Sequence, residues 1–328
     1  MKMQPSRRAL LAAIVFALCS RPSRALVLAQ DAPAEVSVYL LAGQSNMEGQ
    51  AVVDLDHPQH YNGGRGILRS VLDEGRAEGR WSMLRKPDGS WAERDDVWCW
   101  YRSGHGELKA GPLSIGFAVY GGRHHFGPEL MLGHALGELH EEPVLLVKTA
   151  WGGKSLMRDF RPPSAGGESG PYYARMLEEY RAGVQGALER FEGLRERRPV
   201  LRGVVWFQGW NDMVDAEASA SYADNLEHLI GDLRAEFGQA QLPFVVGETG
   251  NCNDLEFRAA QREGCERAEF TRFVPTADFL LPAEDSPNTG HGHHWYGNAE
   301  SYLRIGEALG AAMSALVRPG DSADSSPR

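Results

Sequence analysis

The sequence predicts an α/β fold, namely a three-layer α/β/α sandwich with a central parallel sheet and an elaborated insertion. Two observations support this prediction. Four short apolar runs are continuous rather than alternating, which is typical of strands that are covered on both faces. Helical patterns lie between these runs, and an alternation of strand and helix implies parallel strands with right-handed crossovers. A chain of 328 residues is long enough for one large domain of this kind.

Each predicted strand is rich in aliphatic residues and ends in small or polar residues. The predicted strands are residues 36–42, 144–150, 204–208 and 244–249. Each predicted helix has apolar residues at helical spacing. The predicted helices are residues 129–139, 173–191, 221–237 and 300–316. Pro128 suits a first helical turn and Ser221 suits an N-cap, so the chemistry at two helix starts agrees with the periodicity.

Residues 52–125 interrupt this alternation. They are rich in glycine and in aromatic residues, which include Trp81, Trp91, Trp98, Trp100, Tyr101 and Tyr120. A structureless loop of that length is uncommon inside a compact domain. We therefore expect an elaborated insertion, with short strands, near the active face of the domain.

The two ends of the chain have compositions unlike the rest. Residues 1–29 combine a basic start with an apolar run that is too short to span a bilayer, which predicts a signal peptide cleaved after Ala29 and hence export to the periplasm or beyond. A buried or disordered N-terminal segment is the alternative. Residues 318–328 predict a disordered tail. The folded domain is expected over residues 30–317, with no membrane span.

The net charge and the cysteine content limit the partners and the disulfides that we expect for this chain. The formal net charge is −10, and loss of the five cations in residues 1–29 makes it −15. A chain this acidic repels nucleic acid and anionic membranes. In an exported protein, Cys252 and Cys265 are candidates for a disulfide that leaves Cys99 free, and the sequence leaves this pairing open.

The most informative motif is VYLLAGQSNMEG at residues 38–49, where an apolar run ends in a small polar turn. This turn places Ser45 at the carboxyl end of a buried strand, where open α/β sheets collect their ligands. A serine in that place is a candidate nucleophile. The alternative is that Ser45 or Asn46 only caps the next helix.

Later segments supply the other groups that acyl transfer needs, which are a base and donors to an oxyanion. A glycine pair, Gly152 and Gly153, follows the second predicted strand, and Asn211 follows the third. A candidate base comes from a late loop that contains His291, His293 and His294. These histidines lack the helical spacing and the nearby acid pair of a typical zinc site, so we expect no metal.

Four motifs, which follow one another along the chain, together resemble the motifs of a known family. They are GQSNM at 43–47, AWGG at 150–153, GWND at 209–212, and His294 before NAESY at 298–302. In these motifs the chain resembles the sialate O-acetylesterase-like carbohydrate esterases of the SGNH hydrolase superfamily, and the match covers most of residues 36–316. The resemblance implies the flavodoxin-like SGNH fold. Many members read Q-G-E-S in the third motif, so Trp210 is a departure from the pattern.

The resemblance also implies residue roles. Ser45 is expected as the nucleophile and His294 as the general base. The oxyanion hole is expected from the Ser45 backbone N–H, a backbone N–H of Gly152 or Gly153, and the Asn211 side chain. Three amide residues, Gln44, Asn46 and Gln208, are expected to bind substrate. For Gln44 and Asn46, the alternatives are positioning of Ser45 and hydrogen bonds that stabilise their turn.

The acid that orients the base is not given by the motifs. An aspartate usually stands three residues before the catalytic histidine in SGNH enzymes, but here that position holds His291. Asp285 ranks first as the partner of His294, and Glu248 is a second candidate. A Ser–His dyad held by a backbone carbonyl is a third option.

Taken together, these features predict an exported serine esterase that removes O-acetyl groups from oligo- or polysaccharides through an acetyl-enzyme, without a cofactor. The aromatic residues of the insertion either stack on sugar rings or form a small core. The alternatives are a noncatalytic carbohydrate-binding protein of the same fold, or a lipase or arylesterase. The sequence leaves open the sugar, the position of its acetyl group and the oligomeric state.

Overall fold

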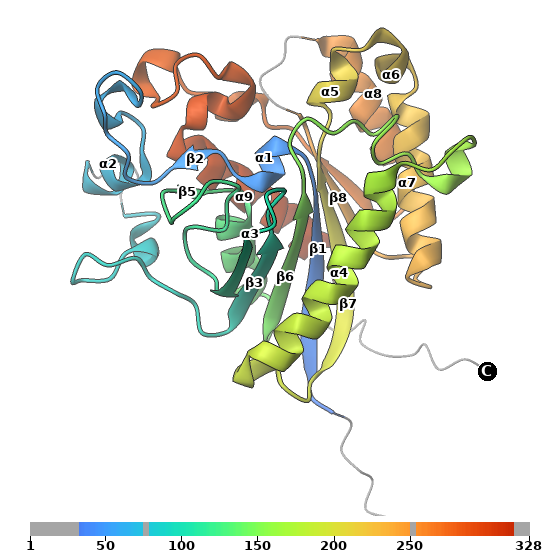
Figure 1. Ribbon diagram of the computed structural model, residues 1–328, viewed down its shortest axis with the longest axis horizontal. Coiled ribbons are helices and arrows are strands. Elements are labelled where there is room, and N and C mark those ends of the chain that lie inside the picture. The colour runs from blue at the N-terminus through green and yellow to red at the C-terminus, as the bar shows by residue number, and fades with distance from the viewer. Residues whose placement is uncertain (1–32, 75–78, 250–253, 318–328) are drawn as a thin grey trace, which may run out of the picture. The chain divides into compact units, whose positions relative to one another are not determined.

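The computed structural model describes residues 33–74, 79–249 and 254–317, which form a sheet between two helical layers (Figure 1). The main sheet has seven strands in the order β4-β3-β6-β1-β7-β8-β9. All neighbours are parallel except β4, which runs antiparallel to β3. The strands are β1 (Glu35–Gly43), β3 (Val97–Arg102), β4 (Leu108–Pro112), β6 (Val144–Ala150), β7 (Arg198–Phe207), β8 (Phe244–Gly247) and β9 (Thr271–Val274). The predicted α/β sandwich is confirmed.

Strand β1 lies at the centre of the sheet and separates two hydrophobic cores. Tyr39 and Leu41 pack into one core, while Val38 and Leu40 pack into the other. All four side chains are fully buried. Since successive side chains of a strand point to opposite faces, a strand covered on both sides needs apolar residues at every position. This explains the continuous apolar run in the sequence.

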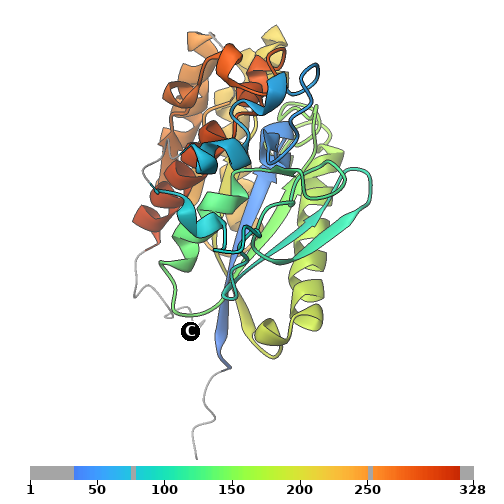
Figure 2. The same ribbon diagram turned by 90° about the vertical axis from the view of Figure 1, so that its left-hand side faces the viewer.

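The helices cover the sheet on both faces. The core on the Tyr39 side contains residues of α3 (Glu129–Gly137) and α9 (Ala299–Leu316). The opposite core contains residues of α4 (Pro171–Arg190), α7 (Tyr222–Glu236) and α8 (Leu255–Glu266). Figure 2 shows α4 and α9 on opposite sides of β1. Short helices and turns connect these layers; they are α1 (Ser45–Glu48), α2 (Leu68–Asp73), α5 (Trp210–Met213) and α6 (Ala216–Ala220).

The predicted strands correspond to β1, β6, β7 and β8, and the predicted helices to α3, α4, α7 and α9. The sequence did not predict α8 and β9. Helix α8 is densely charged, and β9 is a short edge strand with an exposed Arg272, so neither has a strong apolar pattern.

Residues 52–125 contribute β3 and β4 to the main sheet and form a small two-stranded sheet with Phe126, made of β2 (Ala51–Val52) and β5 (His125–Phe126). Trp98 and Trp100 of β3 pack into the core on the α4 side, and Trp81 is buried in the other core. Tyr120 differs from these residues because 45% of its surface is exposed.

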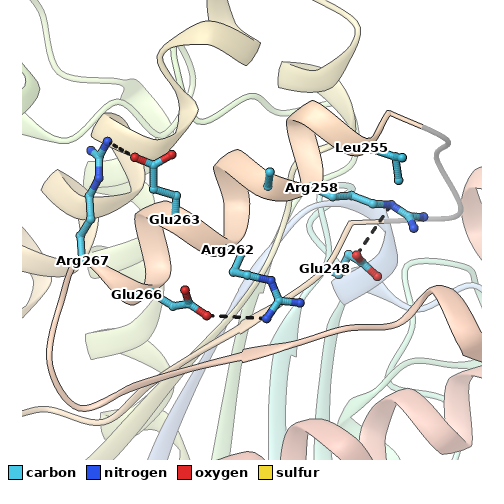
Figure 3. A pocket seen from close by; sticks show the side chains of 8 residues that line it. Glu248, Leu255, Arg258, Arg262, Glu263, Glu266 and Arg267 are labelled. Carbon is cyan, nitrogen blue, oxygen red and sulfur yellow. Dashed lines mark hydrogen bonds and ion pairs between the residues drawn. The ribbon is translucent and has the colours of Figure 1, made fainter.

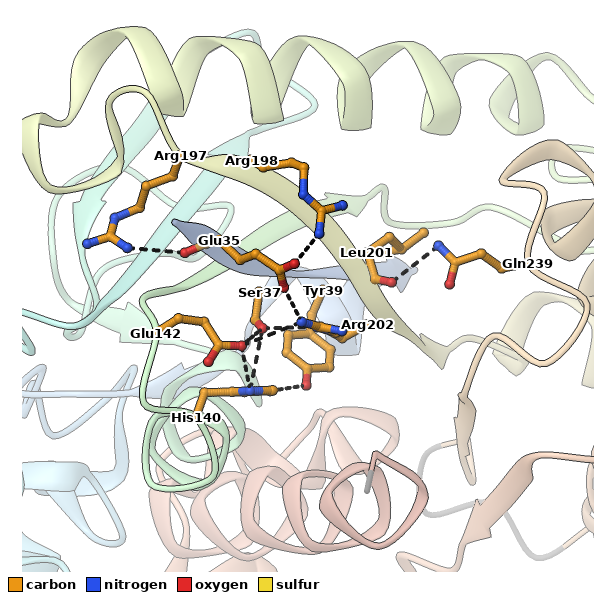
Figure 4. Close-up of polar contacts among 10 residues, drawn as sticks. All are labelled: Glu35, Ser37, Tyr39, His140, Glu142, Arg197, Arg198, Leu201, Arg202 and Gln239. Atoms are coloured by element: carbon orange, nitrogen blue, oxygen red, sulfur yellow. Dashed lines mark hydrogen bonds and ion pairs between the residues drawn. The ribbon is translucent and has the colours of Figure 1, made fainter. Parts of the chain in front are cut away.

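A polar cluster lies at the amino end of the sheet, opposite the end that carries Ser45 (Figure 4). Glu35 of β1 pairs with Arg202 of β7 at 2.5 Å, and the hydroxyl of Tyr39 lies 2.6 Å from Nε2 of His140. Burial lowers the pKa of His140. The cluster joins β1 to β7 and to the loop before β6, so its role is to fix strand register.

Some sequence predictions fall outside the described residues. They are the signal peptide at 1–29, the tail at 318–328 and Cys252 of the candidate disulfide. Cys99 and Cys265 are buried, free thiols. Among the described residues, no helix has the length and apolar character needed to cross a membrane.

Candidate active site

The site forms where β1, β6 and β7 end at their carboxyl edge. Strand β1 ends at Gly43, where an added Cβ would lie 2.2 Å from the backbone oxygen of Phe207. Glycine is therefore required for β1 and β7 to approach so closely. Helix α1 begins at Ser45, two residues later, so the turn presents the serine at the end of the central strand.

Ser45 and His294 meet although 249 residues separate them in the sequence. The Oγ atom of Ser45 lies 2.9 Å from Nε2 of His294, which is hydrogen-bond distance. His294 belongs to the 3₁₀ segment η7 (Gly292–Gly297). Asn46 holds this segment against α1, because its Nδ2 donates to the His293 backbone oxygen (3.1 Å) and its Oδ1 accepts from the Tyr302 hydroxyl (2.7 Å).

The environment of His294 favours its neutral form. The pKa of His294 is lowered to about 3, mainly by burial and to a smaller extent by the neighbouring His293 and His291. Burial has this effect because the charged imidazolium loses its hydration. A neutral imidazole with Nε2 at the serine hydroxyl is able to accept the hydroxyl proton.

Asn211 contacts the nucleophile turn through Gln44, which orients its side chain. The backbone N–H of Gly209 donates to Oε1 of Gln44 (2.9 Å), and Nε2 of Gln44 donates to Oδ1 of Asn211 (3.1 Å). A side-chain amide has one donor group and one acceptor group. Since its oxygen faces Gln44, the nitrogen of Asn211 is its donor, and no described residue accepts from it.

The glycine pair after β6 lies alongside Ser45. A Cβ added to Gly152 would lie 3.7 Å from Cβ of Ser45 and 3.0 Å from Oε2 of Glu48. Burial raises the pKa of Glu48, and a hydrogen bond from the Gly152 backbone opposes that rise. The N–H of Gly152 thus faces Glu48. The N–H of Gly153, whose φ is +73°, has no acceptor among the described residues.

A buried ionic network beneath α1 was not predicted. Nζ of Lys148 lies 2.9 Å from Oε2 of Glu129, and neither side chain is exposed. The same ammonium donates to the backbone oxygen of Glu48 (3.0 Å), at the end of α1. A lysine within the otherwise apolar run of β6 was the available signal, because a buried lysine needs an acidic partner.

Gln208, expected to bind substrate, lies in a buried network of its own. Its Nε2 donates to Oδ2 of Asp212 (2.6 Å) and its Oε1 accepts from the Tyr222 hydroxyl (3.0 Å). Asp212 also accepts from the backbone N–H groups of Leu156 and Met157, and burial raises its pKa to about 6. Gln44, Asn46 and Gln208 all have protein partners, which for Gln44 and Asn46 matches the alternative of turn-stabilising hydrogen bonds.

The structure does not bring Asp285 to His294. Asp285 is exposed at the end of the 3₁₀ segment η6 (Ala283–Asp285), and its backbone oxygen accepts from Asn298. Glu248 is committed elsewhere, because its Oε2 accepts from the backbone N–H groups of Thr276 and Ala277 at 2.8 and 2.9 Å. Within the described ranges, no carboxylate hydrogen-bonds to His294.

Two further features lie outside this catalytic geometry. In the part of the chain that the structure describes, no three His, Cys, Asp or Glu side chains are arranged to hold a metal ion. A pocket of about 570 Å³ lies along α8 (Figure 3). Its arginines are paired with carboxylates, as in Arg262 with Glu266 at 3.6 Å and Arg267 with Glu263 at 2.7 Å. Neither Ser45 nor His294 lines this pocket.

Comparisons with known proteins indicate the family of this chain. A family model described as "SASA: Carbohydrate esterase, sialic acid-specific acetylesterase" matches residues 35–315. A curated relative, the probable carbohydrate esterase At4g34215 of Arabidopsis thaliana, is 24% identical over 212 residues. That match spans 63% of this chain and 66% of the relative.

Solved structures show the same fold. The Arabidopsis thaliana protein AT4G34215 superposes with a TM-score of 0.56 at 16% identity, over 88% of this chain and 100% of that one. NanS gives a TM-score of 0.53 at 14% identity, over 86% and 97%. XAC1771, a carbohydrate acetylesterase from Xanthomonas citri, gives 0.50 at 17% identity, over 85% and 56%.

Proposed function

Since the chain belongs to the family of carbohydrate esterases described as sialic acid-specific acetylesterases, we propose that it is a serine esterase that removes O-acetyl groups from carbohydrates. The observation that carries this proposal is the 2.9 Å hydrogen bond between Ser45 Oγ and His294 Nε2. The Asn211 amide and the turn at Gly152 lie beside the same serine.

In the proposed mechanism, His294 removes the hydroxyl proton of Ser45 while Oγ attacks the acetyl carbonyl carbon. The oxyanion that forms accepts hydrogen bonds from the Asn211 amide and from the backbone N–H groups of Ser45 and Gly153. Donors placed for the developing charge are commonly the largest contribution to such a step. Collapse of the intermediate breaks the ester bond, and His294 protonates the leaving sugar oxygen. Water then releases acetate from the acetyl-enzyme by the reverse proton path.

We assign Gln44, Asn46 and Gln208 to positioning rather than to substrate contact. Gln44 orients Asn211, and Asn46 holds the backbone of His293. Gln208 supports the turn after Gly153 through its bond to the Lys154 backbone oxygen at 2.9 Å. Each amide therefore acts on a neighbour of the reacting atoms.

We assign Tyr120 to contact with the sugar. Its hydroxyl donates to Oε1 of Gln50 (2.6 Å), and Nε2 of Gln50 donates to the backbone oxygen of Ser45 (3.0 Å). Lys109 binds the backbone oxygens of Gly116 and Tyr120, so the loop that carries this ring is anchored. A restrained aromatic ring with an exposed surface, next to the nucleophile turn, is a suitable platform for a sugar ring.

The proposal includes export of the chain, which the basic and apolar character of residues 1–29 supports. It also includes a neutral or weakly charged oligo- or polysaccharide as substrate. Arg158, which follows the glycine turn, pairs with Asp215 at 2.8 Å, and this pairing does not favour an anionic substrate group there. A noncatalytic carbohydrate-binding protein has no use for a serine and a histidine held at hydrogen-bond distance, which favours the enzyme over that alternative.

The test is acetate release from a panel of acetylated glycans, with 4-nitrophenyl acetate and longer acyl esters run in parallel. Ser45→Ala is expected to abolish release, while Ser82→Ala, which changes an exposed serine, is expected to retain it. Activity that survives Ser45→Ala would contradict the serine mechanism. A preference for long acyl chains would favour the lipase alternative, and loss of activity with a chelator would indicate a metal.

A further inference from the structure

We infer that Trp210 and His293 are positioning residues for His294, and that their rings, packed at a tilt against one another and against His294, hold the imidazole in place of a carboxylate partner. This inference rests on the proposed serine mechanism. It concerns how the base is held, rather than whether the ester is cleaved.

Three rings, each tilted against the next, form a ring stack that runs from Trp210 through His293 to His294. The ring centroids of Trp210 and His293 are 4.8 Å apart with an interplanar angle of 31°. Those of His293 and His294 are 4.0 Å apart with an angle of 52°. Trp210 directly precedes Asn211, so the stack connects the neighbour of the oxyanion donor to the proposed general base.

The first and middle rings of the stack are anchored to the residues that flank Ser45. Gln44, on one side, accepts from the backbone N–H of Gly209 (2.9 Å), immediately before Trp210. Asn46, on the other side, donates to the backbone oxygen of His293 (3.1 Å). The nucleophile turn therefore sets the position of Trp210 and of His293 relative to Ser45.

A catalytic imidazole needs an element that fixes its orientation, and a carboxylate on Nδ1 is the usual one. No described carboxylate hydrogen-bonds to His294, and Asp285 is exposed on a separate turn. Trp210 also stands where Q-G-E-S has its glutamate, so no carboxylate is available at that position. Packing of aromatic rings supplies orientation without a charge.

The pH dependence of kcat/KM reports on the groups that surround His294, because they determine its pKa. His291 and His293, from the same segment, are the titratable groups that act on it among the described residues. The carboxylates of Glu48 and Asp212 are bound elsewhere, to Gly152 and to the backbone N–H of Leu156, and neither is among the groups that shift the pKa of His294. Burial, to which the stack contributes, lowers the pKa of His294, so water that replaces a ring raises it.

The experiment compares Trp210→Ala with Trp210→Phe, using full kinetics on 4-nitrophenyl acetate across pH. We expect Trp210→Ala to lower kcat about 10- to 100-fold with little change in KM, because a misplaced base costs rate rather than binding. We also expect the acid limb of kcat/KM to move to higher pH. Trp210→Phe is expected to retain most of kcat, because it keeps a ring in the stack.

His293 gives an independent second pair. His293→Phe keeps a ring and is expected to retain most of kcat, whereas His293→Ala is expected to behave like Trp210→Ala. Phe270→Ala, which removes an exposed ring elsewhere, is the matched control. Thermal unfolding of each variant shows whether the protein is folded at the assay temperature.

Wild-type kcat and an unchanged pH profile in both alanine variants would overturn the inference. Equal loss in the phenylalanine and alanine variants would also overturn it, as would a rise in KM for glycans alone, which would indicate a sugar contact. Failure of the proposed function itself is recognised separately, because wild-type protein and Ser45→Ala would then release acetate equally.

Discussion

Gln44 donates a hydrogen bond to the side-chain oxygen of Asn211 across 3.1 Å, and this contact fixes which end of the Asn211 amide faces the site. The orientation of Gln44 is itself fixed, because its own oxygen accepts from the backbone N–H of Gly209. Gln44 is buried, so water does not compete for these bonds. The direction of one amide thus determines the donor available to an oxyanion.

Gln44→Glu tests this relationship with almost no change in shape. A carboxylate still accepts from Gly209 but has no proton to give to Asn211, so the Asn211 amide turns its nitrogen away from the site. We expect kcat to fall by about 10²–10³, the usual cost of one lost oxyanion donor, with KM nearly unchanged. Gln59→Glu, at an exposed glutamine, is the charge-matched control, and kinetics on 4-nitrophenyl acetate make the measurement.

Asn211→Ala is expected to cause a loss of similar size, because it removes the same donor directly. The double variant with Gln44→Glu is then expected to be no worse than either single variant. Losses that multiply in the double variant would show that Gln44 acts on the reaction by a route other than Asn211.

The central part of the fold was predictable from the sequence, because a strand buried on both faces requires apolar residues at every position. Strands β1, β6, β7 and β8 have apolar runs that reflect cover on both faces. Strand β4 has no such run, since it is a partly exposed edge strand that contains Lys109. Its partner β3 lies in a stretch rich in tryptophan and glycine. From the sequence alone, such residues are equally consistent with packing into the main core and with a small local core.

The candidate site was likewise predictable from the sequence only in part. Ser45, Asn211 and His294 each stand at a strand end or in a loop, so motif and topology together indicate that they converge. The partners of Gln44 and Asn46 were not predictable, because they lie 167 and 247 residues away and depend on side-chain rotamers. Asp285 was expected from its position on the histidine loop, but proximity in sequence does not direct an exposed side chain toward the site.

The pH dependence of activity follows from the neutral state of His294. Its pKa is lowered to about 3, so the base form persists well below the ordinary histidine value of about 6.5. We expect kcat/KM for 4-nitrophenyl acetate to stay nearly constant as pH falls from about 8 to 5, because the free enzyme keeps an unprotonated base. Circular dichroism at each pH confirms that the protein is folded. A tenfold loss per pH unit below about 6.5 would contradict the assigned environment.

The buried pair of Lys148 and Glu129 predicts a large effect on stability. Lys148→Met leaves the carboxylate of Glu129 buried without its cation, and this is expected to lower the free energy of unfolding by about 3–5 kcal/mol. Urea denaturation measures the change. The double variant with Glu129→Gln is expected to recover part of the loss, because no unpaired charge then remains.

Arg80→Met is the matched control for that pair. Arg80 is exposed and pairs with Glu307 at 2.6 Å, so its loss is expected to change the free energy of unfolding by about 1 kcal/mol or less. Similar losses in Lys148→Met and Arg80→Met would show that the buried pair has no special role beneath α1.

Tyr120→Ala is expected to separate glycan substrates from small esters. Removal of the exposed ring is expected to raise KM for an acetylated oligosaccharide, while kcat/KM for 4-nitrophenyl acetate changes less than about threefold, because the small ester does not reach the platform. Tyr120→Phe keeps the ring and is expected to retain glycan binding. Equal effects of Tyr120→Ala on both substrates would indicate that Tyr120 supports Ser45 through Gln50 rather than contacting sugar.

The most direct test of the whole account is intact-mass and peptide-mapping mass spectrometry after rapid quenching with an acetyl ester. Wild-type protein is quenched within its first turnover, before water releases the acetyl group, and Ser45→Ala is treated in the same way. The account predicts one added acetyl group on the peptide that contains Ser45, and none in Ser45→Ala. An acetyl group on another residue, or acetate release by Ser45→Ala at the wild-type rate, would contradict it.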